Sequence, residues 1–138
     1  MASGFSTTVR NHVLDHLFHT GAPESVTIYG ALCDADPGDA GDMAGQEIAA
    51  AFDYARTALL MATGANAGSI ANTTALEFPP ANGGNWGTIT HLAIVASATE
   101  ATDDMQASGS LTASKTINDG DQLKFAVGNI TVSIAVQA

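Results

Sequence analysis

The chain has 138 residues, which fits one domain with a core of its own and leaves little room for a second. It carries 14 Asp+Glu against 4 Lys+Arg, a formal net charge of −10. Binding to nucleic acid and to anionic lipid depends on basic patches, so neither is an expected partner. The chain lacks the ~20 consecutive apolar residues that span a bilayer, its start lacks the basic-then-apolar order of a signal peptide, and Cys33 alone cannot form an intrachain disulfide. We therefore expect a soluble, acidic, single domain over residues 1–138.

The first predicted element is a helix over residues 6–19. Its apolar residues follow an i, i+4, i+5, i+8 spacing, which gathers them on one helix face: Val9, Val13, Leu14, Leu17 and Phe18. Ser6 or Thr7 can cap the start, and Gly21 followed by Pro23 supplies a stop.

The next three segments differ in pattern. Residues 25–33 alternate between apolar and small or polar side chains, which predicts a strand with one buried face. Residues 34–45 are rich in Gly, Pro and Asp and predict an exposed acidic loop. Residues 47–61 are rich in helix formers, so propensity predicts a helix there, although tertiary context often overrides propensity.

From residue 62 onwards the pattern predicts β-structure. A small-residue loop over Ala62–Ala71 comes first, and Asn118–Asp121 is a strong tight-turn signal. The predicted strands cover residues 73–78, 86–96, 105–111, 122–126 and 129–136. Strands at this spacing predict a mostly β fold, an antiparallel β-sandwich (Ig-like or jelly-roll-like) of about seven strands with one N-terminal α-helix. The predicted core contains Val26, Ile28, Leu76, Phe78, Ile89, Leu92, Ile94, Phe125, Ile130, Val132 and Ile134.

Three histidines on the predicted helix are the sharpest candidate metal ligands. His12, His16 and His19 are spaced i+4 and i+3, which places them on one side of a helix. Such a set can hold zinc, copper or nickel if a further ligand, such as Asp15, completes it. The alternative, which we favour, is a polar helix flank or subunit contact without a metal.

Other candidate sites are weaker. The acidic loop holds Asp34, Asp36, Asp39 and Asp42 but departs from the EF-hand pattern, so a solvated turn is favoured over a calcium site. Cys33 ends an apolar strand, and His91 lies inside a strand, so both are interpreted as packed residues. Ser108 and Ser110 stand outside any nucleophile-elbow motif. We therefore expect a protein that is not an enzyme and has no cofactor.

The chain resembles small virion proteins of tailed bacteriophages, of the capsid-decoration or tail-fibre-like kind. The matching stretches run in order along the chain: 14–18, 26–32, 36–39, 54–56, 78–80, 85–91 and 114–121, followed by Leu123 and Phe125. The resemblance implies β-structure for residues 54–60, against local propensity. It brings no catalytic residues.

Two structural roles follow from this resemblance. The first is a capsid decoration (cement) protein on the outer surface of the virion, bound to the major capsid protein and stabilising the shell. The second is a tail or tail-fibre component. Acidity disfavours contact with packaged DNA, and low charge with many Ala and Gly residues favours a homo-oligomer, with a trimer expected. Candidate docking segments are Ala2–Val9 and Ala62–Ala71.

Overall fold

The computed structural model describes residues 4–7, 9, 13, 27–40, 43–62, 68–99 and 105–134. Nine β-strands are defined in these residues, and every strand pairing among them is antiparallel. This confirms the prediction of a mostly β, antiparallel fold. The nine strands are β1 (Gly4–Phe5), β2 (Ile28–Cys33), β3 (Thr57–Leu59), β4 (Ser69–Ala71), β5 (Leu76–Glu77), β6 (Gly87–Val95), β7 (Met105–Ile117), β8 (Lys124–Phe125) and β9 (Thr131–Ser133).

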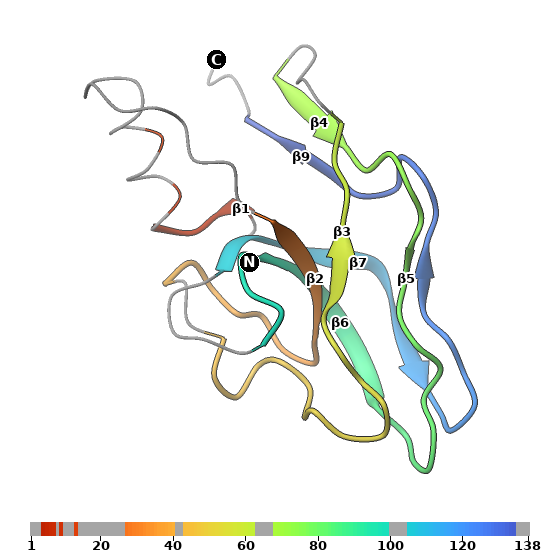
Figure 1. Ribbon diagram of the computed structural model, residues 1–138. Helices are drawn as coiled ribbons and strands as arrows, with labels where there is room; N and C mark the ends of the chain where they lie inside the picture. The colour runs from red at the N-terminus through yellow and green to blue at the C-terminus, as the bar shows by residue number, and fades with distance from the viewer. Residues whose placement is uncertain are drawn as a thin grey trace.

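Five of the strands form one sheet in the order β1-β7-β6-β2-β3 (Figure 1). The central strand β6 pairs with β2 from Val95 to His91 and with β7 along most of its length. The apolar residues of β6 contact neighbouring layers on both faces of the sheet. The strand is therefore buried, as its apolar sequence predicts.

The other four strands form two short pairs, β4–β9 and β5–β8. Figure 1 shows β5 and β8 running side by side along one margin, with β4 and β9 at one end of them. Side chains of β5 and of the segments around β8 and β9 join the main core against one face of the large sheet. The cluster includes Leu32, Leu59, Leu76, Phe78, Ile89, Leu92, Ile94, Ile117, Leu123 and Ile130.

A second, smaller cluster packs on the other face of the same sheet. It contains Ala31 and Cys33 from β2, Ala93 and Val95 from β6, and Met105 from β7. Met43, from the acidic loop region, is 1% exposed and packs against them. The large sheet is therefore covered over part of both faces.

Most of the residues predicted to form the core are buried or half-buried, and one is exposed. Leu76, Phe78, Ile89, Leu92, Ile94 and Ile130 are buried, whereas Ile28, Phe125 and Val132 are half-buried at the margin of the core. Ile134 was predicted to be buried but is 62% exposed. It lies just beyond β9, where the alternation no longer faces a neighbouring layer. Val26 lies outside the described residues.

Two segments differ from the predictions made for them. Propensity predicted a helix over residues 47–61, but the chain turns at Phe52 and Asp53, whose φ angles of 55° and 63° are left-handed. It then forms β3, which lies within residues 54–60, where the resemblance implied β-structure. The predicted loop Ala62–Ala71 ends in a strand, because Ser69–Ala71 pairs with Thr131–Ser133. The predicted helix over residues 6–19 falls mostly outside the described residues; of the residues described there, Thr7, Val9 and Val13 are helical. No helix in that part is long and apolar enough to span a membrane.

Gly30 in β2 gives a direct test of the packing between the layers. A Cβ at Gly30 would lie 2.5 Å from Leu76 Cδ2 and 3.4 Å from Phe78 Cζ. We predict that Gly30→Ala lowers the free energy of unfolding by about 1–3 kcal/mol, because core overpacking forces its neighbours to shift. Denaturant unfolding measures this change. Gly109→Ala is the matched control, because a Cβ there meets nothing within 4 Å; an equal loss in both variants would contradict the packing described.

Candidate functional site

A groove of about 780 Å³ lies between the large sheet and the segment that carries β8 and β9. One wall comes from β1, β6 and β7, and the other from residues 123–125 and 129–133. Four apolar side chains that line it, Phe5, Leu111, Phe125 and Val132, are only half-buried although they pack on the main core. The groove therefore exposes apolar side chains that are continuous with the core, beside polar residues such as Ser110 and Thr112.

The strand that forms one wall of this groove is incompletely paired. At its outer edge, β7 pairs within the described residues with β1, at Ala107 and Ser108. At its inner edge, its register to β6 shifts: Ser110 pairs with His91 and Lys115 with Ile89. Residues 111–114 thus lie opposite the single residue Thr90. Such a bulge leaves backbone donors and acceptors outside the ladder, so β7 offers polar backbone as well as apolar side chains.

The groove also differs in charge from the rest of the protein. Two of the four basic residues in the sequence, Lys115 and Lys124, line it. Lys124 forms an exposed ion pair with Glu77. Residues 105–134 contain two lysines and two aspartates and are neutral overall, although the whole chain carries −10.

A buried ion pair lies where β2 ends and β3 begins. The guanidinium of Arg56 donates from Nε to Glu47 Oε1 at 2.9 Å and from Nη2 to Glu47 Oε2 at 2.7 Å. Both side chains are almost fully buried, with exposures of 2% and 7%. Arg56 Nη1 also donates to the carbonyl oxygens of Ser97 and Thr99. The two-pronged geometry fits a planar guanidinium and fixes three chain segments to one another.

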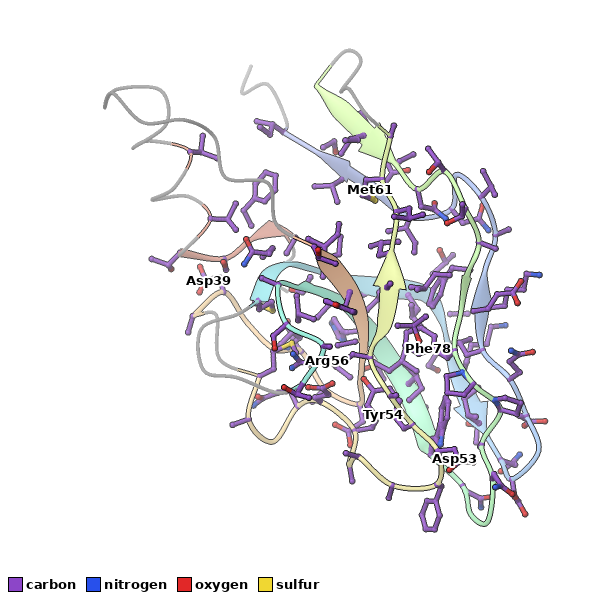
Figure 2. All side chains as sticks on the ribbon, viewed as in Figure 1. Asp39, Asp53, Tyr54, Arg56, Met61 and Phe78 are labelled. Carbon is purple, nitrogen blue, oxygen red and sulfur yellow. The ribbon has the colours of Figure 1, made fainter. Side chains whose placement is uncertain are left out.

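Tyr54 completes this arrangement. Its hydroxyl donates to Glu47 Oε1 at 2.8 Å and accepts from the backbone N–H of Leu32 at 2.9 Å. Its ring stacks at 6.2 Å from Phe78 and meets Trp86 edge-on at 5.5 Å. Figure 2 shows Tyr54 and Arg56 on the segment that leads into β3. The Tyr54 side chain therefore links the ion pair to the main core.

Burial, followed by the nearby carboxylate of Glu47, raises the pKa of the Cys33 thiol to about 12 and also raises the pKa of Tyr54. At neutral pH both groups are therefore protonated. A thiol held in this form is a weak nucleophile. The geometry thus assigns Cys33 to packing, as its sequence context predicted.

The residues proposed from sequence as metal ligands do not assemble into a described site. His12, His16 and His19 lie outside the described residues, as does Asp42. Asp36 Oδ1 accepts from the N–H of Gly38, which makes it a turn-forming residue. Within the described ranges, no group of three His, Cys, Asp or Glu side chains is placed to hold a metal ion.

The remaining candidates occupy separate places in the sheet. His91 is buried, with Nδ1 at 2.8 Å from Thr90 Oγ1. Ser108 is buried and Ser110 is exposed on β7. The candidate docking segment Ala2–Val9 contains β1 (Gly4–Phe5), a strand of the large sheet. Deleting this segment would therefore remove structure as well as surface.

The sequence interpretation missed both the groove and the ion pair. Residues 54–56 were quoted only for their resemblance, and Glu47 was assigned to a helix. The available signal was composition: Arg56 is one of only four basic residues, in a segment that alternates before β3. Arg is almost never fully buried unless it is paired, so a buried Arg56 requires a partner such as a carboxylate.

Removing the Arg56 guanidinium tests how much the structure depends on this pair. We predict that Arg56→Met lowers the free energy of unfolding by about 3–5 kcal/mol, because Glu47 is left as a buried charge without its partner. Chemical denaturation followed by tryptophan fluorescence reports the change through Trp86. As a control, Lys124→Met removes an exposed pair and should cost no more than about 1 kcal/mol. Similar losses in the two variants would contradict this prediction.

Comparison with known proteins identifies the family. A family model described as podophage GP4 fiber I protein gp80 matches residues 4–133, nearly the whole chain. No curated protein matches this sequence. The match confirms the resemblance to small virion structural proteins of tailed phages. The chain belongs to the podophage GP4 fiber I protein gp80 family.

Proposed function

We propose that this protein is a structural component of a phage tail fibre or its attachment, and that it acts by non-covalent assembly rather than by catalysis. The observation that carries this proposal is the family match over residues 4–133, whose description names a fibre protein. This supports the tail or tail-fibre alternative better than capsid decoration. We also propose that the large sheet and the two short strand pairs together make a β-sandwich.

The geometry supports an assembly role. The groove combines apolar side chains with backbone outside the β6 register, which suits a protein partner. The buried Glu47–Arg56 pair and the aromatic cluster around Tyr54 lie in the packed interior. They fix the scaffold, while the groove margin offers contact surface.

Copy number in the particle tests the proposal. We predict a small number of copies per virion, located at the tail, because a fibre component follows the symmetry of the tail and not that of the shell. Quantitative mass spectrometry of purified particles, with the major capsid protein as internal standard, measures this number. Gold labelling of an affinity tag on the protein gives its location in the same particles.

The capsid-decoration reading makes the opposite prediction. A cement protein bound to the major capsid protein would be present at about one copy per coat subunit and would be labelled over the whole shell. That result would overturn the fibre proposal. Label confined to the tail at low copy number would support it.

A further inference from the structure

We propose that the groove between β7 and the β8–β9 segment is an interface that a second copy of this chain covers. This interface extends the proposed fibre role by naming the partner and the surface. Only its biological setting rests on that proposed role. The surface consists of residues 109–115 of β7 together with Phe125 and Val132.

The backbone of β7 supplies the first argument. Among the described residues, β1 pairs with the outer edge of β7 at Ala107 and Ser108, and residues 111–114 bulge from the β6 register opposite Thr90. Exposed strand edges are templates for pairing with another chain. An extended segment of a partner can hydrogen-bond there and complete the ladder.

Apolar surface supplies the second argument. Leu111, Phe125 and Val132 line the groove and are half-exposed. A run of apolar residues along one side of a domain marks an interaction surface. A partner strand with alternating apolar residues would bury this side.

The distribution of charge along the chain favours a second copy of this chain as the partner. A chain that carries −10 repels its own copies wherever acidic surfaces meet. Residues 105–134 are neutral overall, so two copies can approach through this side. A copy of the chain also brings β7 itself, whose alternating Ala107, Gly109, Leu111 and Ala113 fit a pleated partner.

The oligomeric state of the purified full chain tests this proposal. We expect light scattering to give a dimer or a higher oligomer. Leu111→Asp should weaken association at least about tenfold, because it places a carboxylate in the apolar contact. Ala58→Asp is the matched control: it adds the same charge to an exposed residue of β3, at the opposite edge of the sheet, and should leave the mass unchanged. Far-UV circular dichroism checks that both variants keep their β-structure.

A cross-linking experiment keeps the proposal testable if Leu111→Asp fails to fold. Ala113 is exposed on β7, and the sole native cysteine, Cys33, is buried. Ala113→Cys should give a disulfide-linked dimer with oxidised glutathione, whereas Ala58→Cys should stay monomeric on a denaturing gel. A wild-type monomer at all concentrations, or cross-linking only through residue 58, would overturn the interface. Neither result depends on where the protein lies in the virion, so the fibre proposal is tested separately.

Discussion

The buried pair of Glu47 and Arg56 is the interaction on which the arrangement of this protein depends. It connects the segment after the acidic loop, the start of β3 and the loop after β6, which are distant in sequence. Burying two charges is costly unless each is paired and fully hydrogen-bonded. Here the Glu47 carboxylate accepts hydrogen bonds from the Arg56 guanidinium and from the Tyr54 hydroxyl. These bonds together specify one geometry for the pair.

This constraint explains why an alanine-rich segment does not form a helix. Glu47 forms a β-bridge to Cys33 at the end of β2, and its side chain is held by Arg56. The chain must therefore reverse between them, and it does so at Phe52 and Asp53 with left-handed backbone. The carbonyl of Phe52 accepts from Trp86 Nε1 and from the N–H of Asn82, which holds that turn in place. Tertiary bonds thus override local propensity.

Much of the fold follows from local patterns in the sequence. Alternation located β2 and β6 closely, since both are central strands with buried apolar residues. Short or peripheral strands were harder: β1 has two residues, and β4 is a small-residue segment whose pairing with β9 depends on contacts distant in sequence. The exposed Ile134 shows the same limit, because alternation indicates a face but not whether a neighbouring layer reaches it.

The candidate site was less accessible to sequence reasoning than the fold. The groove combines β7 with residues more than ten positions later, and its open backbone arises from a register shift that no local pattern marks. Sequence reasoning instead gave weight to histidines and aspartates, whose spacing suggests metal chemistry whether or not a site exists. The family match supports a structural role in the virion.

Hydrogen–deuterium exchange along β7 tests the central claim, that its open edge is covered by another copy, most directly. Exchange would be followed by mass spectrometry at low and at high protein concentration. The account predicts that amides of residues 111–114 become protected as concentration rises, while those of β3, at the other edge of the sheet, keep their rates. Equal exchange of residues 111–114 at both concentrations, in a protein that does associate, would contradict it.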